Sequence, residues 1–212
     1  MKTVLYLVRH GATEANLAQP ARLQGRGHNP PLAPLGISQA EATRDHLACT
    51  KITRCYSSPM LRAQQTAEII AKPHHLTPTT LEELTECDVG KWEGMDWGSI
   101  RFLDAERYFL FMQNPAVNGY PGGESFGDVF NRVAPKLEEI VRQNEGETIL
   151  VVAHHVVNRT YLASLLGYPP EKAREVKLDN CGVSVLEHDT ESDCLTVRTL
   201  NATQHLTRLR AA

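Results

Sequence analysis

The chain has no apolar run long enough to cross a membrane. Its 212 residues contain only short apolar segments, whereas a membrane-spanning helix needs about 20 consecutive apolar residues. The start, Met1-Lys2-Thr3 followed by a short apolar run, also lacks the longer apolar region and the small-residue cleavage site of a signal peptide. These absences argue against a membrane partner and predict a cytoplasmic protein.

An excess of positive charge is missing too. Lys and Arg number 22 against 25 Asp and Glu, which gives a net charge of −3. Proteins that bind nucleic acid are basic overall, because they neutralise backbone phosphates. We therefore expect no nucleic-acid partner, and any anion site in this chain must be a local concentration of Arg side chains.

Paired cysteines and metal-ligand spacings are absent as well. The five cysteines are scattered and include no Cys-x-x-Cys pair, so the sequence predicts neither a disulfide framework nor a zinc site. They are expected to remain thiols in a reducing compartment. The adjacent pairs His74-His75 and His154-His155 would place their side chains on opposite faces of a strand. We expect no metal and no other cofactor.

The chain does contain short apolar strands that alternate with amphipathic helices. Strands are predicted over residues 3–8, 54–57, 79–84 and 148–153, with late antiparallel strands over 183–187 and 195–200. Helices are predicted over residues 38–46, 97–113 and 156–166, the last of them ending before Gly167. Another is predicted to begin at Pro59, after an N-cap at Ser58. A further helix is predicted from Phe126, after an N-cap at Ser125, with a kink at Pro135. This alternation predicts an α/β fold with a mostly parallel central sheet. The length fits one domain, 1–212, with a helical cap segment around 95–125.

Side chains suited to phosphate lie at the carboxyl ends of these predicted strands. Arg9 and His10 directly follow the first strand, His154 follows the strand over 148–153, and Arg62 lies in the first turn after the second strand. Carboxyl ends of parallel strands share one edge, where open α/β sheets bind their ligands. Arg suits phosphate, neutral His can act as a nucleophile, and a helix N-terminus favours anions. The sequence therefore predicts a pocket for a phosphoryl group.

These residues also have plainer structural interpretations. Arg9 alone could be a surface ion-pair residue, but its recurrence with similar residues at other strand ends favours a site. Glu86 is the candidate acid, although Glu82, Glu83 and Asp88 lie nearby and any of these carboxylates could be solvated. The aromatic residues between 92 and 111 more often belong to a core than to a lid, although this segment could in part cap the site.

Five ordered motifs resemble the signature of the histidine phosphatase superfamily, which includes cofactor-dependent phosphoglycerate mutases and small-molecule phosphatases. They are LVRHGATEAN (7–16) with QG (24–25) and LG (35–36), YSSPMLRAQQTA (56–67), ECDVGKWEG (86–94), GGES (122–125) and VAH (152–154). The resemblance spans most of the chain and implies the three-layer α/β/α arrangement of phosphoglycerate mutase-like proteins.

The resemblance also implies roles for individual residues. His10 would be transiently phosphorylated, and Glu86 would donate a proton to the leaving group. Contacts to the phosphoryl group are implied for Arg9, Arg62, His154 and Asn16, and contacts to the rest of the substrate for Gln24 and Gly25. The chain departs from the family pattern at His155, where Gly commonly follows the second His. We expect His155 to lie at the start of a helix, either beside the pocket or against the flank of the sheet.

Three functions remain open at this stage. The leading hypothesis is a metal-independent phosphomonoester hydrolase, which acts on small phosphorylated metabolites through phosphohistidine as a monomer or homodimer. A bisphosphoglycerate-dependent phosphoglycerate mutase is the alternative, and a non-catalytic phosphate-binding regulatory module is the third. The short segment 94–122 favours the hydrolase because Arg101 and Arg107 are its only cations. The joint presence of His10 and Glu86 favours catalysis over the regulatory module.

Overall fold

The computed structural model describes residues 1–209 of the chain. Within this range, six strands form one mixed sheet in the order β3-β2-β4-β1-β5-β6. Their bounds are β1 (Lys2–Arg9), β2 (Arg54–Ser57), β3 (Thr79–Thr80), β4 (Thr148–Ala153), β5 (Val183–Asp189) and β6 (Cys194–Ala202). Strands β1 to β4 run parallel to one another, whereas β5 pairs antiparallel with both β1 and β6. The predicted mostly parallel sheet is confirmed.

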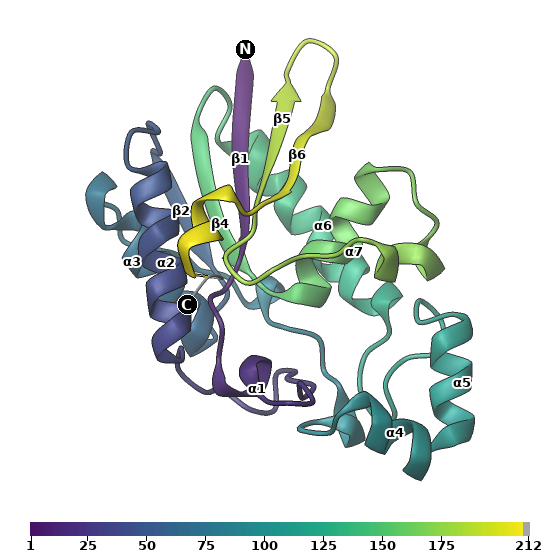
Figure 1. Cartoon of the computed structure of the whole chain (residues 1–212). Helices are drawn as coiled ribbons and strands as arrows, with labels where there is room; N and C mark the ends of the chain where they lie inside the picture. Colours follow the sequence, from purple (N-terminus) through teal and green to yellow (C-terminus); the bar gives the residue numbers. More distant parts are fainter. Residues whose placement is uncertain (210–212) are drawn as a thin grey trace.

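Helices cover both faces of this sheet (Figure 1). Helices α2 (Pro34–Leu47) and α3 (Leu61–Ala71) lie on one face, and α6 (Phe126–Gln143) and α7 (His155–Leu165) lie on the other. Side chains alternate between the faces along β4: Leu150 and Val152 pack in the core on the α2–α3 side, and Ile149 and Val151 in the core on the α6–α7 side. Because both faces are covered, residues 149–153 are fully buried.

The first two predicted helices, which are α2 and α3 of the structure, begin at other residues than the sequence indicates. Helix α2 begins at Pro34, with Ala33 as N-cap, and Ser38 lies inside the helix and donates to the carbonyl of Pro34 at 3.3 Å. Proline suits a first helical position because it has no N–H to leave unsatisfied. Helix α3 begins at Leu61, after an N-cap at Met60. Ser58 is therefore free to serve the site described below.

The prediction for residues 79–84 and 97–113 is also wrong in part. Strand β3 has only two residues and leads into a 3₁₀ turn, η2 (Glu82–Leu84). The predicted long helix is two helices, α4 (Trp97–Leu103) and α5 (Ala105–Gln113), which meet at Asp104. The carboxylate of Asp104 accepts a 3.0 Å hydrogen bond from the indole N–H of Trp92, a contact that the sequence pattern does not reveal.

The later elements agree more closely with prediction. Helix α6 begins after Ser125 in a capping box with Asp128, and it continues through Pro135 to Gln143. Pro135 is exposed, so the carbonyl it cannot satisfy faces solvent. Helix α7 ends before Gly167, which has a φ of 75°. The short helices are α1 (Glu14–Leu17), η1 (Lys72–His74), η3 (Gly90–Trp92), η4 (Pro170–Glu175) and η5 (Gln204–Leu209). Across the described range, no helix has the length and apolar composition that a membrane crossing requires.

Helices α4 and α5 form a segment beside the carboxyl ends of the central strands (Figure 1). Its aromatic residues divide between two environments. Trp92 and Phe111 are buried and pack edge-to-face at 5.6 Å between ring centroids, whereas Phe102 is 86% exposed. Trp92, Phe111 and Ile100 belong to the same apolar core as the α6–α7 side of the sheet. We propose that the α4–α5 segment caps a single domain, because its core is continuous with that of the sheet.

Candidate active site

The ends of the two central parallel strands bring two histidines together. Strand β1 pairs with β4 so that Arg9 lies opposite Ala153, and His10 and His154 directly follow these residues. Their rings meet edge-to-face, with 5.1 Å between centroids. Both side chains are buried, at 3% and 0% exposure. The structure thus places these two predicted residues side by side.

The imidazole of His10 has a defined tautomer. Its Nδ1 lies 2.7 Å from the carbonyl oxygen of Gly11, which can only accept, so Nδ1 carries the proton. The other nitrogen, Nε2, accepts a 3.3 Å hydrogen bond from Nε of Arg62. Burial, followed by the nearby charges of Arg62 and Arg9, lowers the pKa of His10 well below its usual value. His10 is therefore neutral at physiological pH, with the lone pair on Nε2.

Arg62 is fully buried, and its position depends on the loop between α1 and α2. Its two terminal nitrogens donate to the carbonyl oxygens of His28 at 3.2 Å and Gly25 at 3.1 Å. A Cβ at Gly25 would lie 2.6 Å from the carbonyl oxygen of Cys87, so only glycine fits this close approach. Gly25 does not line the cavity described below, and its carbonyl helps to hold the Arg62 guanidinium in place. The expected contact of Gly25 with substrate stays a prediction.

Arg9 reaches the site from the end of β1. One terminal nitrogen donates to the carbonyl oxygen of Leu178 at 2.7 Å, and Nε has no partner among residues 1–209. Burial lowers the pKa of Arg9 to about 10, although the negative charge of Glu86 opposes the shift. The guanidinium is thus still charged at neutral pH.

Ser58 pairs with His154 instead of capping a helix. Nε2 of His154 lies 2.7 Å from Oγ of Ser58, which also accepts from the backbone N–H of Met60. Nδ1 of His154 is buried and has no partner within the described chain. Burial and then the charge of Arg62 lower the pKa of His154 well below its usual value.

Glu86 occupies the N-terminus of α7. The backbone N–H groups of His155 and Val156 donate to its Oε2 at 3.0 and 3.4 Å, and that of Cys87 donates to Oε1 at 2.8 Å. The sequence predicts that these first N–H groups of the helix bind phosphate, and this is wrong: the carboxylate of Glu86 takes them. A helix N-terminus stabilises a carboxylate by the same electrostatics that would favour phosphate.

A partly buried ion pair holds the segment that carries Glu86. Arg132 donates to both carboxylate oxygens of Glu124, at 2.8 and 3.1 Å, and to the backbone carbonyl of Glu83 at 2.6 Å. Glu124 also accepts from the backbone N–H of Asp88 at 2.8 Å. Glu124 belongs to the GGES motif, and the structure explains this part of the motif as support for the Glu86 segment.

These groups border a cavity of about 340 Å³ at the carboxyl ends of the strands. Of the predicted residues, Arg9, His10, Asn16, Gln24 and Glu86 are on its wall. Arg62 and His154 lie behind His10, at 0% exposure. Oε1 of Gln24 accepts from the hydroxyl of Thr13 at 2.9 Å, and Oδ1 of Asn16 accepts from the amide of Asn180 at 3.3 Å.

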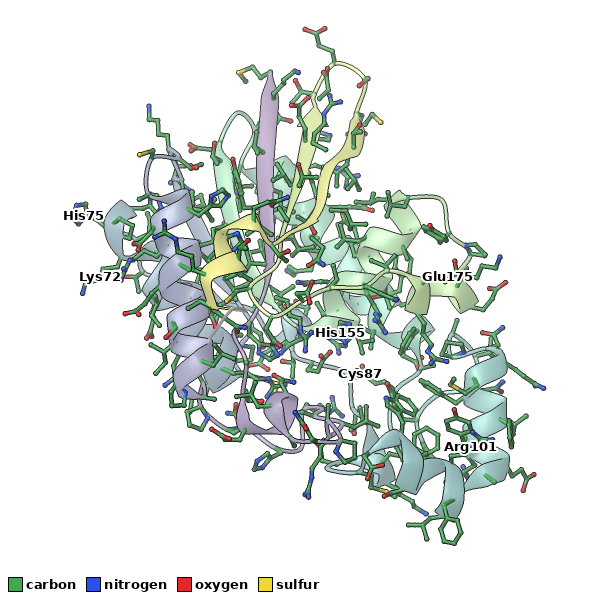
Figure 2. All side chains as sticks on the ribbon, viewed as in Figure 1. Lys72, His75, Cys87, Arg101, His155 and Glu175 are labelled. Atoms are coloured by element: carbon green, nitrogen blue, oxygen red, sulfur yellow. The ribbon has the colours of Figure 1, made fainter. Side chains whose placement is uncertain are left out.

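Sequence reasoning missed several residues of this wall. They are Ala21, Arg22, Leu23, Val89, Tyr120, Val156, Arg159 and Asn180, whereas Trp97 belongs to the aromatic segment that the sequence indicates could in part cap the site. Arg159 had a signal, because it lies one helical turn after His155 and donates to its Nε2 at 2.8 Å. His155 is at the first position of α7 and on the cavity wall, as expected. Figure 2 shows it below the central strands, whereas Arg101 lies out on the cap.

Within residues 1–209, no group of three or more His, Cys, Asp or Glu side chains is arranged to hold a metal ion. The charge on the cavity wall comes from Arg9, Arg22 and Arg159, with Glu86 as its one carboxylate among the described residues. The sequence argument for a hydrolase over a mutase counted only the cations within residues 94–122 as groups that could hold a second phosphate. It is incomplete, because Arg22 and Arg159 come from outside that segment.

Known proteins resemble this chain over most of its length. Phosphoserine phosphatase 1 of Hydrogenobacter thermophilus is 32% identical over 202 residues, 95% of this chain and 93% of that protein. A probable phosphoglycerate mutase of Proteus mirabilis, GpmB, is 29% identical over 206 residues, 96% of this chain and 94% of that protein. The solved structure of YhfR from Bacillus stearothermophilus has a TM-score of 0.88 and 31% identity, and the match covers 96% of this chain and 99% of that one.

Other curated relatives are longer. Three mycobacterial proteins are 34% identical over 205 residues, and the match covers 96% of this chain but 55% of each of them. The chain thus spans about half the length of these relatives. The family model described as histidine phosphatase superfamily (branch 1) matches residues 5–203. With this match over nearly the whole chain, and with the two histidines at neighbouring strand ends, the chain belongs to the histidine phosphatase superfamily, branch 1.

Proposed function

We propose that the protein hydrolyses phosphomonoesters of small metabolites through a phosphohistidine at Nε2 of His10. The state of His10 carries this proposal. Its proton is held on Nδ1 by the carbonyl of Gly11, and burial keeps the ring neutral, so Nε2 carries a lone pair at neutral pH; the 3.3 Å hydrogen bond from Arg62 to this atom must pass to the phosphoryl group when the lone pair attacks. The proposal gives His10 the role of nucleophile.

In the first step, the lone pair of Nε2 attacks phosphorus and the bond from phosphorus to the ester oxygen breaks. The departing oxygen takes a proton from Glu86 on the cavity wall, which we propose enters the cycle in its protonated form. In the second step, water attacks the phosphohistidine and returns a proton to Glu86. Inorganic phosphate leaves, and the bonding electrons return to Nε2. Two easier transfers thus replace one difficult hydrolysis.

The proposed phosphoryl contacts are Arg9, Arg62 and His154. Phosphoryl transfer spreads negative charge over the equatorial oxygens, so fixed donors supply most of the stabilisation. Arg62 already donates to the attacking nitrogen, and Arg9 Nε and His154 Nδ1 have no partner among residues 1–209. These groups are buried and are held by backbone carbonyls or by Ser58, so they need little reorganisation.

Water is proposed as the final acceptor rather than a second phosphoglycerate. Relatives of this chain carry phosphatase and mutase names. The cap supports hydrolysis, because Arg101 and Arg107 are exposed and lie off the cavity wall. A cap whose cations lie off the cavity wall contributes less to holding a bisphosphate intermediate against water.

The test is to trap the intermediate and follow its phosphate. We expect an acid-labile phosphoenzyme with a chromogenic aryl phosphate in excess chelator, absent in His10→Ala. Activity should survive the chelator because the positive charge of the cavity wall comes from Arg side chains. Activity that is lost in chelator and restored by a divalent ion would contradict a metal-independent reaction. Primed conversion between phosphoglycerates that outpaces phosphate release would assign the mutase reaction. Phosphoenzyme in the His10→Ala variant would overturn the nucleophile.

A further inference from the structure

Arg159 is a half-buried cation on the cavity wall whose hydrogen-bond partner is uncharged. Its terminal nitrogen donates to Nε2 of His155 at 2.8 Å, and its Nε has no partner among residues 1–209. Burial, followed by the charges of Arg9 and Arg159, lowers the pKa of His155 well below its usual value. Burial lowers the pKa of Arg159 itself to about 10. Arg159 is therefore charged at neutral pH beside a neutral histidine.

The proposed chemistry leaves this charge without a function. A phosphoryl dianion is matched by Arg9 and Arg62, which lie next to His10. Glu86 is committed to the N–H groups of α7 and Cys87. Arg159 lies on the same wall and a whole helical turn beyond His155. The negative charge of Glu86 also acts on Arg159 and opposes the lowering of its pKa. Among residues 1–209, however, no carboxylate forms an ion pair with Arg159. A half-buried guanidinium without an ion-pair partner is costly, and a ligand anion is one way to offset this cost.

The size of the cavity limits how far the ligand's second group can lie from its phosphate. About 340 Å³ is near the lower end of small-molecule sites. One cavity of this size borders both His10 and Arg159, so an ester that fills it has its phosphate at His10 and its remainder beside Arg159. The planar fork of Arg matches a carboxylate, which can accept two parallel hydrogen bonds.

We propose that Arg159 selects phosphomonoesters that carry a carboxylate on the leaving group, and that His155 positions its guanidinium for this contact. The inference rests on the proposed phosphatase function and deepens it. Nδ1 of His155 carries the proton, because Nε2 accepts from Arg159. The backbone N–H of His155 donates to the carboxylate of Glu86, and this hydrogen bond fixes the place of His155 at the start of α7.

The test compares two esters that differ by one group. O-phosphoserine has a carboxylate that O-phosphoethanolamine lacks, and their phosphate, hydroxymethyl and amine groups are otherwise the same. We expect kcat/KM to favour phosphoserine by roughly 10- to 100-fold, the range for a hydrogen bond to a charged group. Arg159→Gln should remove this preference by lowering kcat/KM for phosphoserine and should change phosphoethanolamine by less than about threefold. His155→Gly should weaken the preference to a smaller extent.

Two further variants separate recognition from structure. Arg159→Lys keeps the charge but loses the fork, so it should retain part of the preference. Arg101→Gln removes an exposed cation of the cap, off the cavity wall, and should leave both substrates unchanged. Equal losses for both esters in Arg159→Gln would overturn the inference and assign Arg159 a structural role. So would equal kcat/KM for the two esters in the unmodified enzyme.

The two proposals fail in different ways. Equal, His10-dependent hydrolysis of both esters would keep the phosphatase function and remove the carboxylate selection. If no ester is hydrolysed, the phosphatase function fails, and calorimetric binding to His10→Ala then measures the preference without turnover. The selection would be supported if the His10→Ala variant binds phosphoserine more tightly than phosphoethanolamine and if the double variant His10→Ala with Arg159→Gln loses this difference. Equal affinities of the His10→Ala variant for the two esters would overturn it.

Discussion

The inner and outer walls of the cavity differ in how they are built. On the inner side, His10 lines the cavity at 3% exposure, and Arg62 and His154 contact it from within the protein, at 0% exposure each. They come from the ends of β1 and β4 and from α3, and hydrogen bonds to backbone carbonyls or Ser58 hold them. The outer wall includes Trp97 and Arg159, which are partly exposed and come from the cap and from α7.

This difference separates reaction from selection. Groups at the ends of buried parallel strands have little freedom, which suits the transfer of a phosphoryl group at a fixed atom. Loops and cap helices tolerate change more readily, which suits recognition of different leaving groups. Arg174 joins the cap to the rest of the protein, with its guanidinium 5.8 Å from the ring centre of Trp97. Outer-wall variants should therefore change preference, and inner-wall variants should change turnover for every substrate.

Glu86 lies between the two walls, and its replacement has the largest expected effect. Glu86→Gln should lower kcat by roughly 10²- to 10⁴-fold with an alkyl phosphate, because the alkoxide leaving group needs a proton. An aryl phosphate with a good leaving group should lose much less. Steady-state kinetics with both esters measures the contrast, and thermal unfolding checks that the amide is accommodated at the start of α7. Equal losses for the two esters would remove Glu86 from the proton-donor role.

The adjacent histidines test the comparison most directly. His154→Ala should lower kcat by roughly 10²- to 10³-fold for all esters, the usual loss of one donor to a developing charge. His155→Ala should keep turnover of phosphoethanolamine and lower that of phosphoserine, because His155 contacts Arg159 and not His10's ring. The two variants carry the same substitution at consecutive positions of the chain, so each serves as a control for the other. The reverse pattern would exchange their roles.

Stability at low pH gives a smaller effect. Burial lowers the pKa values of His10, His154 and His155 from 6.5. As pH falls below about 6.5, these side chains take up protons in the unfolded chain but not in the folded one, so folding stability falls. Each histidine contributes about 1.4 kcal/mol per pH unit until its folded pKa is reached.

Urea unfolding between pH 7.5 and 5.5 measures this slope. The variant His155→Gln should be less sensitive to pH, by one histidine's contribution, while exposed carboxylates titrate equally in both proteins. Parallel curves for the two proteins would contradict a neutral, buried His155. Above pH 7 the two slopes should agree, because the histidines are then neutral in the folded and unfolded chains.

The sequence by itself determined the sheet and the inner wall. Residues 148–153 form a continuous apolar run, which a parallel strand buried on both faces requires. Because such strands end at one edge, the side chains that follow them meet there, and His10 and His154 could be paired without coordinates. The N-cap at Ser125 and the end of α7 before Gly167 were also predictable, since each depends on local backbone chemistry.

Only the tertiary structure decided the contacts between distant segments. Ser58 has the sequence of a helix cap, but β4 brings His154 within 2.7 Å of its hydroxyl. Helix α7 offers N–H groups suited to phosphate, but Glu86 takes them. A local sequence pattern indicates the propensity and periodicity of one segment and carries no information on its distant partners. The two pairs are separated by 96 and 69 residues in the chain. Their pairing depends on where the sheet and the α6–α7 core place each segment, and for this reason the outer wall and Arg159 became visible only in the folded chain.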